Sequence, residues 1–288
     1  MEEVTHCPVA ERNFSELVPL RTSGRTPPLF CVHYGNFQQM AAAMQVDQLI
    51  YGLRPLNLDT TDMNLTIEQL AANYLQQVCS VQEHGPYRFA GYSFGGLVAY
   101  EMATLLANRG EEVGLLALMD TGAQLKFRRN LSSDERKRLR KIYIADRAKK
   151  YARNLIEGRV DKIWLDASQY VGRLKPIGWK IAQRVSQILG YPLPKVMRSQ
   201  SLMFTAMLRS YTPKEFRGRL VLFRPEERSP EDDVDPYLGW HQYPKYGIDV
   251  QFVPGSHATM MQMPNVATMA RKLAPYLEHS LNSKHNGF

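Results

Sequence analysis

The serine at position 93 lies in a pattern that could make its hydroxyl a nucleophile. It is the centre of Gly-Tyr-Ser-Phe-Gly, a Gly-x-Ser-x-Gly sequence. Such a serine is placed on a sharp, strained turn between a strand and a helix, and Gly91 and Gly95 lack the β-carbons that would collide where the two elements crowd each other. Phe94 would begin the helix, so its backbone N–H is free to stabilise a developing oxyanion. The pattern predicts acyl transfer through Ser93.

The segments on either side of this pattern fit a strand followed by a helix. Residues 87–90 suit a short buried strand, and residues 97–107 suit a helix that Arg109 and Gly110 would end. This context favours a nucleophile turn over a Gly/Ser-rich turn without chemistry. A serine alone is a poor nucleophile, so the reaction also needs a base to accept its proton and an acid group to hold that base.

The candidate base is His257, which follows the last predicted strand, residues 248–253. In open α/β sheets the reacting groups gather beyond the carboxyl ends of the strands. His33 also ends a predicted strand, residues 29–33. The expected chain order of serine, acid and histidine favours His257, whereas a structural role at the turn that follows suits His33 better.

The candidate acid is Asp120, which directly follows the apolar run at residues 113–119. In that position it would be partly buried and able to hold an imidazole in one tautomer. The competing carboxylates follow the next strand, in a loop rich in proline and charge that is more typical of a solvated surface turn. They are Glu226, Glu227, Asp232, Asp233 and Asp235. We therefore favour Asp120, because a lone carboxylate after a buried strand is the better partner for a histidine.

Predicted strands alternate with predicted helices along most of the chain, which predicts a parallel sheet covered on both faces. Apolar residues at helical spacing indicate a helix over residues 66–81, and Thr66 with Gln69 offers a capping box at its start. Residues 14–30 resemble an extended leading segment. The remaining elements are strands at 49–53, 113–119, 219–223 and 248–253, and a closing helix at 264–282.

Residues 126–210 interrupt this alternation with a helix-favouring, aromatic and basic stretch, which predicts a helical insertion into the sheet domain. This stretch holds 21 Lys and Arg against 6 Asp and Glu, a net charge of +15, whereas the rest of the chain carries −7. A charge run is most often a solvated helix face. As a functional reading, an acidic protein partner or ligand fits better than nucleic acid, since no nucleic-acid-binding motif accompanies the charge.

The composition narrows the class of protein further. A chain of 288 residues can bury the core of one large domain, and without 18 consecutive apolar residues no membrane span is expected. The N-terminal residues 1–13 have no apolar core typical of a secretory signal. The three cysteines lack metal or redox spacing, so we expect free thiols in a cytoplasmic protein without a metal site.

Several of these stretches resemble the thioesterase domains that end nonribosomal peptide synthetases and polyketide synthases. The most specific is Gly-Pro-Tyr-Arg-Phe-Ala-Gly-Tyr-Ser-Phe-Gly-Gly at residues 85–96. The others are residues 17–21, 28–33, 118–120, 237–240 and 254–257. The resemblance implies an α/β-hydrolase fold: a mostly parallel sheet with helices on both faces and a helical lid insertion at about 126–210. It divides the chain into an N-terminal extension, residues 1–25, and a thioesterase domain, residues 26–288.

The resemblance also implies roles for the residues already singled out. Ser93 would accept an acyl group from the phosphopantetheine thiol of a carrier protein, His257 would act as general base and acid, and Asp120 would orient it. The family's second oxyanion donor comes from the turn after the first strand, which corresponds here to Tyr34 or Gly35. This chain has Tyr-Gly-Asn where the family has a Pro-x-Gly-Gly type of turn. Either N–H could therefore be the donor.

The expected activity is cleavage of a peptidyl or polyketide-like thioester, with release of the product by hydrolysis or cyclisation. The expected partner is an acidic acyl or peptidyl carrier protein that contacts the basic lid, with no cofactor apart from the phosphopantetheine that the carrier brings. Two alternatives remain open. One is a stand-alone editing thioesterase that clears stalled acyl groups, and the other is a catalytically silent hydrolase-like module that binds a carrier protein or small ligand.

Overall fold

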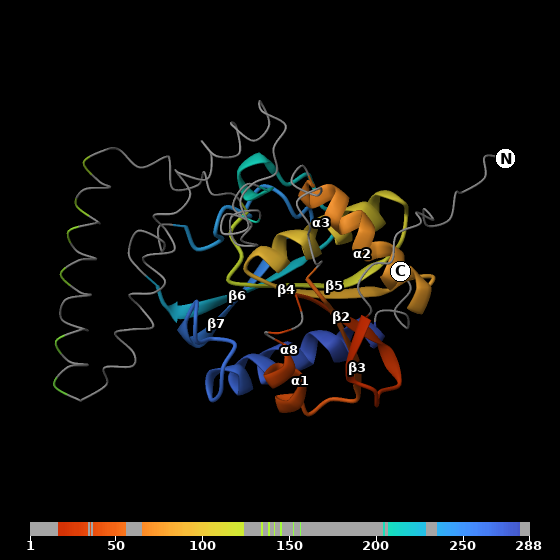
Figure 1. The fold of residues 1–288 in the computed structure, drawn as a ribbon, viewed down its shortest axis with the longest axis horizontal. Coiled ribbons are helices and arrows are strands. Elements are labelled where there is room, and N and C mark those ends of the chain that lie inside the picture. Colours follow the sequence, from red (N-terminus) through yellow and green to blue (C-terminus); the bar gives the residue numbers. More distant parts are fainter. Residues whose placement is uncertain are drawn as a thin grey trace, which may run out of the picture.

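The computed structural model describes most of the chain outside the N-terminus, the predicted lid and the C-terminus (Figure 1). The described ranges are 17–33, 35, 37–55, 65–123, 207–228 and 235–282, with single positions at 134, 138, 141, 145, 152, 156 and 204. Most of the predicted lid, residues 126–210, and its basic runs lie outside the described residues. None of the helices in the described ranges has the length and apolar character that crossing a bilayer requires.

Within the described residues the sheet has seven strands in the order β1-β3-β2-β4-β5-β6-β7. All neighbouring pairs are parallel except β1 and β3, which are antiparallel. The strands are β1 (Leu17–Arg21), β2 (Thr26–Val32), β3 (Gln48–Leu53), β4 (Tyr87–Tyr92), β5 (Val113–Met119), β6 (Leu220–Glu227) and β7 (Ile248–Ser256). The predicted mostly parallel sheet is thereby confirmed. Its antiparallel edge strand, β1, lies inside the predicted leading segment and N-terminal extension.

Helices cover both faces of the sheet, as predicted (Figure 1). The helices α2 (Ile67–Val81) and α3 (Phe94–Asn108) lie on one face, and α1 (Gln38–Ala43) and α8 (Asn265–Asn282) lie on the other. The side chains of β2 contact both layers of helices, because successive side chains of a strand point to opposite faces of the sheet. Phe30 and Val32 are buried in the core with α2 and α3, whereas Leu29 and Cys31 are buried in the core with α1 and α8.

The helix predicted over residues 66–81 is confirmed together with its cap. The Gln69 N–H donates to Thr66 Oγ1 at 3.2 Å, and the Thr66 N–H donates to Gln69 Oε1 at 3.0 Å. Both donors are backbone N–H groups at the helix N-terminus, where no partner within the helix exists. The capping box therefore defines where α2 begins. By contrast, α1 has no side-chain cap and only two of its residues, Met40 and Ala41, are buried, which is why its sequence carries little signal.

The strand β4 and the helix α3 are joined by a single residue, Ser93, at a place where the backbones nearly touch. A β-carbon on Gly91 would lie 2.5 Å from the Gly95 carbonyl oxygen, and one on Gly95 would lie 2.8 Å from the Val32 carbonyl oxygen. Such contacts are shorter than real β-carbons make. Glycine at both positions therefore allows α3 to begin directly at the carboxyl end of β4.

Candidate active site

Ser93 is held in a strained backbone conformation by hydrogen bonds to the neighbouring strand. Its φ of 54° and ψ of −120° are rare for a residue with a side chain, and such strain is kept only where the surroundings enforce it. The Ser93 N–H donates to the Met119 carbonyl oxygen at 3.0 Å. The Ser93 carbonyl oxygen accepts from the Thr121 hydroxyl and from the Gly96 N–H, both at 3.1 Å. The serine hydroxyl is thereby presented at the carboxyl end of the sheet.

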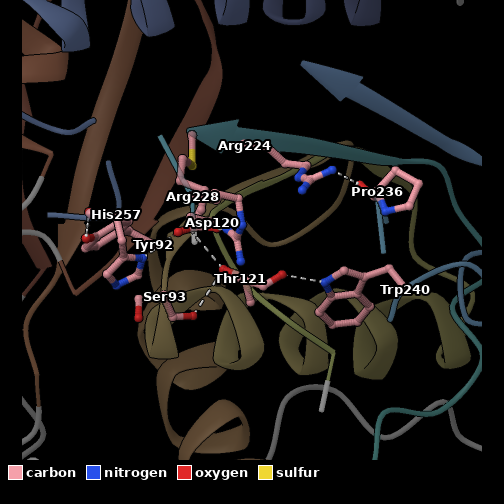
Figure 2. Close-up of polar contacts among 10 residues, drawn as sticks. Tyr92, Ser93, Asp120, Thr121, Arg224, Arg228, Pro236, Trp240 and His257 are labelled. Carbon is pink, nitrogen blue, oxygen red and sulfur yellow. Dashed lines mark hydrogen bonds and ion pairs between the residues drawn. The ribbon is translucent and has the colours of Figure 1, made fainter. Parts of the chain in front are cut away.

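Residues 121–123, which include Thr121, are also hydrogen-bonded to the loop before β7. The Trp240 indole N–H donates to the Thr121 carbonyl oxygen at 2.7 Å, and Trp240 is fully buried (Figure 2). The Ala123 N–H, two residues further on, donates to the Leu238 carbonyl oxygen at 2.9 Å. The segment after β5 is therefore fixed on two sides, by the serine turn and by the 237–240 loop.

The structure brings Asp120 and His257 together although 137 residues separate them. His257 Nδ1 lies 2.7 Å from Asp120 Oδ2, and the Asp120 side chain is only 5% exposed. Asp120 directly follows β5, has a φ of 43°, and donates its N–H to the Phe223 carbonyl oxygen of β6 at 2.8 Å. In Figure 2 the His257 ring lies between the Asp120 carboxylate and the Ser93 side chain. With Nδ1–H donated to the carboxylate, Nε2 is the nitrogen left to accept a proton.

The competing carboxylates are exposed, have partners in their own loop or lie outside the described residues. Glu226 and Glu227 are exposed at the end of β6. Asp235 accepts hydrogen bonds from backbone N–H groups of its own loop, at Tyr237 and Gly239. The two remaining candidates, Asp232 and Asp233, are not among the described residues.

The predicted oxyanion hole has one donor, the Phe94 N–H, among the described residues and a second at Tyr34 or Gly35. Phe94 is the first residue of α3, so its N–H has no acceptor within the helix. Its ring is stacked on Phe204, with centroids 4.1 Å apart. On the other side, Tyr34 lies outside the described residues. Gly35 is described, and a β-carbon added there would meet nothing within 4 Å. The second donor therefore stays a prediction.

Tyr92 is a site residue that the sequence analysis did not identify. Its ring stacks on the His257 imidazole with centroids 5.0 Å apart, and its hydroxyl donates to the His257 carbonyl oxygen. Burial raises the pKa of this phenol to about 12, so the hydroxyl keeps its proton and remains a donor at neutral pH. The variable position before the serine carries no local signal for such a contact.

Arg228 is the second residue that the sequence analysis missed. It directly follows β6, its side chain is 12% exposed, and its guanidinium pairs with Asp120 Oδ1 (Figure 2). The nearby Arg224 is engaged differently: it donates to the Pro236 carbonyl oxygen at 2.9 Å, and its guanidinium lies 5.5 Å from the centre of the Phe252 ring. Both arginines come from a segment whose composition suggested only a strand and a charged turn.

His33 lies beside the serine turn and not in the hydrogen-bonded pair. It directly follows β2 with a φ of 62°, and its ring is stacked against Phe94 at 5.5 Å and Phe204 at 5.3 Å. Burial lowers the pKa of the imidazole from its ordinary 6.5 to about 4, so the ring is neutral at physiological pH. A neutral ring next to Phe94 adds no charge to the place where an oxyanion would form.

Within the described ranges, no group of three His, Cys, Asp or Glu side chains is arranged to hold a metal ion. The chemistry available from the described side chains is therefore that of a serine hydroxyl, an imidazole and a carboxylate at the end of a parallel sheet. This combination is suited to nucleophilic acyl transfer.

Comparison with known proteins finds similarity to thioesterase domains and to peptide synthetases. The thioesterase domain family matches residues 27–152. The chain is 29% identical to malpibaldin synthetase of Mortierella alpina over 277 residues, which is 93% of this chain and 4% of that protein. It is also 29% identical to a dimodular nonribosomal peptide synthase of Bacillus subtilis, covering 91% of this chain and 11% of that protein. Part of this chain therefore matches the thioesterase domain family, and most of it is similar to a segment of each synthetase.

The fold of this chain is shared with a solved structure. The NocB thioesterase domain, in covalent complex with a fluorophosphonate nocardicin G analogue, superposes with a TM-score of 0.58 at 20% identity, covering 91% of this chain and all of that one. The family resemblance and the α/β-hydrolase fold expected from the sequence are confirmed, while the helical lid stays a prediction. The chain spans only a small fraction of the two synthetases it matches.

We expect His33 to make this protein less stable in acid. Between pH 6.5 and about 4 the unfolded chain binds a proton at this imidazole that the folded chain does not, so stability falls as the pH is lowered through that window. Denaturant unfolding at a series of pH values measures this loss. His33→Phe, which keeps an aromatic ring in the stack and removes the titration, should show a shallower decline. Equal slopes for the two proteins would contradict burial of a neutral His33.

Proposed function

We propose that this chain is a thioesterase that cleaves an acyl thioester through an acyl-serine intermediate on Ser93. The observation that carries the proposal is the 2.7 Å contact between His257 Nδ1 and Asp120 Oδ2, formed beside a serine on a strained turn. Ser93, Asp120 and His257 directly follow three different strands, β4, β5 and β7. The family match over residues 27–152 supports the thioester as the bond that is cleaved.

In the proposed reaction, His257 Nε2 accepts the Ser93 proton while Ser93 Oγ attacks the thioester carbonyl carbon. The negative charge passes to the carbonyl oxygen, where the Phe94 N–H at the start of α3 would stabilise it. When the tetrahedral intermediate collapses, the C–S bond breaks and the imidazolium returns its proton to the departing thiolate. Asp120 holds the imidazole in the required tautomer and stabilises its charged form.

The acyl-serine is then released by a second nucleophile that enters by the same route. For hydrolysis, His257 takes a proton from water, the hydroxide oxygen attacks the acyl carbon, and Ser93 regains its proton as the acid leaves. An internal hydroxyl or amine of the acyl chain in place of water would give a cyclic product. The acyl chain is proposed to be peptidyl or polyketide-like, because two proteins of Bacillus subtilis that the chain resembles are named a nonribosomal peptide synthase and a polyketide synthase.

We further propose that the acyl group arrives on the phosphopantetheine arm of a carrier protein. The thiol leaving group then belongs to the partner, and the chain needs no resident cofactor for the steps above. The net charge of +15 over residues 126–210 supports an acidic carrier as that partner, since complementary charge speeds encounter.

Ser93→Ala should abolish thioesterase activity, with a fall in kcat of about 10⁴-fold or more, because no other group replaces the nucleophile. His257→Ala should cause a loss of similar size. Turnover of short acyl thioesters, followed by release of free thiol, measures both. A fluorophosphonate probe should add one mass increment to the wild-type protein and none to Ser93→Ala.

The exposed Ser80 on α2 provides a matched control, because Ser80→Ala removes a serine hydroxyl far from the site and should leave turnover and labelling unchanged. Labelling at a residue other than Ser93 would contradict the assignment of the nucleophile. A wild-type protein that neither reacts with the probe nor turns over thioesters would favour the silent binding module instead.

Tyr92→Phe should reduce kcat modestly, by about three- to tenfold, since the ring can still stack on His257 while one hydrogen bond to its backbone is lost. Tyr92→Leu removes both contacts and should cost at least about tenfold more. Steady-state kinetics with one thioester, alongside thermal unfolding of each variant, separates the two contributions. Equal activity of the Phe and Leu variants would show that the stack does not position His257.

Reversing the charge of the basic run, in the variant Arg136/Lys137/Arg138/Arg140→Glu, should lower kcat/KM on a carrier-bound acyl thioester by about tenfold or more at low salt. A free acyl thioester of the same acyl group is the internal control, and its kcat/KM should not change. Added salt should reduce the difference in kcat/KM between the wild-type protein and the variant on the carrier-bound substrate. An equal effect on both substrates, or no effect on either, would contradict docking of an acidic carrier by this charge.

A further inference from the structure

The Asp120 carboxylate has a nitrogen-bearing partner on each of its two oxygens. Oδ2 faces His257 Nδ1 at 2.7 Å, and Oδ1 is paired with the Arg228 guanidinium. With the carboxylate side chain 5% exposed and the arginine 12% exposed, the pair is largely shielded from water. A buried carboxylate is costly to keep ionised unless it is both paired and hydrogen-bonded. The arginine supplies that pairing on the side away from the histidine.

Asp120 and Arg228 both follow strands that end at the same side of the sheet. β6 runs parallel to β5, with Met119 opposite Phe223, so both strands end at the same side of the sheet. Asp120 follows β5 directly, and Arg228 follows β6 directly. Arg224 also lies near this end but is engaged with the Pro236 carbonyl oxygen and the Phe252 ring. The two arginines of the segment therefore have different partners and different roles.

We propose that Arg228 is a positioning residue that holds Asp120 ionised and oriented, and that its charge sets the pH at which His257 becomes able to accept a proton. This inference rests on the proposed acyl-serine mechanism, in which His257 must be neutral to act as a base. Asp120 by itself favours the charged imidazolium, since opposite charges attract. The arginine opposes that effect, because its positive charge disfavours a second positive charge on the ring.

Three other titratable groups among the described residues, Tyr92, Glu227 and His33, do not supply this opposing charge. Tyr92, stacked on the ring, keeps its proton, since burial raises its pKa to about 12. Glu227 is exposed, and its position on β6 is in register with Ser256, the residue before His257. As an exposed carboxylate it is screened by solvent and has the wrong sign. His33 lies in the aromatic stack beside Phe94 and is neutral above about pH 4. Arg228, by contrast, is a cation that is largely shielded from water and pairs with the Asp120 carboxylate.

The test is to titrate the His257 imidazole by NMR in the folded protein, with Ser93→Ala present so that no turnover interferes. His257→Gln identifies the signal. Arg228→Gln should raise the pKa of His257 by about one unit, because a nearby positive charge is lost. Arg228→Lys keeps the charge and should leave the pKa within about 0.3 units of the parent value. With Ser93 restored, the acid limb of the kcat/KM profile should shift by the same amount.

Arg219→Gln is the matched control, since it removes an exposed positive charge just before the opposite end of the same strand. It should leave the His257 titration unchanged. Should Arg228→Gln fail to fold, as judged by thermal unfolding, Arg228→Met is the second neutral variant. A His257 midpoint in the neutral variant that equals the parent value would overturn the proposal, as would an Arg228→Lys shift as large as the neutral variant's.

The titration also separates this inference from the proposed function. A wild-type protein without thioesterase activity would contradict the proposed function, yet the effect of Arg228 on His257 would still be measured. Conversely, if the enzyme is active and Arg228→Gln leaves the pKa of His257 unchanged, the acyl-serine mechanism stands and the role proposed for Arg228 is contradicted. If the ion pair only stabilised the fold, Arg228→Gln would lower the temperature of unfolding without moving the imidazole titration.

Discussion

Parallel pairing of neighbouring strands is the constraint on which the whole site depends. β2, β4, β5, β6 and β7 run in the same direction, so their carboxyl ends meet at one side of the sheet. The residue directly after each strand is a chemically active or charged side chain. These residues are His33, Ser93, Asp120, Arg228 and His257. Positions that are distant in the chain are in this way brought within reach of a hydrogen bond, as between Asp120 and His257.

Backbone strain at this side of the sheet is held by the packing beneath it. His33, Ser93 and Asp120 all have positive φ, which costs free energy for residues with side chains. The cost is offset by backbone hydrogen bonds between adjacent strand ends, from Ser93 to Met119 and from Asp120 to Phe223. Each strained residue turns the chain sharply away from its strand at the carboxyl end of the sheet. Rigidity of this kind is what a reaction that depends on fixed geometry requires.

The environment of the imidazole combines one attractive and one opposing charge with a neutral aromatic surface. Asp120 accepts from the ring, the Tyr92 phenol packs against it, and Arg228 balances the carboxylate on the far side. The balance matters because a base that binds its proton too tightly stays charged at neutral pH, while one that binds it too weakly cannot take it from serine. We therefore infer that Arg228 acts on His257 through the Asp120 carboxylate that orients the ring.

Local features of the protein could be predicted from its sequence: the alternation of strands and helices, the capping box of α2, the glycines of the serine turn and the residues that directly follow β4, β5 and β7. These follow from spacing and propensity over a few residues, which is information that a short segment carries. The short helix α1, the edge strand β1, the contact of Tyr92 with His257 and the pairing of Arg228 with Asp120 were decided only by the tertiary structure. Their physical reason is non-local, because each depends on strand register and on packing between segments that are far apart in the chain. For the same reason, several carboxylates were compatible with the sequence, and the relative placement of β5, β6 and β7 put Asp120 against His257.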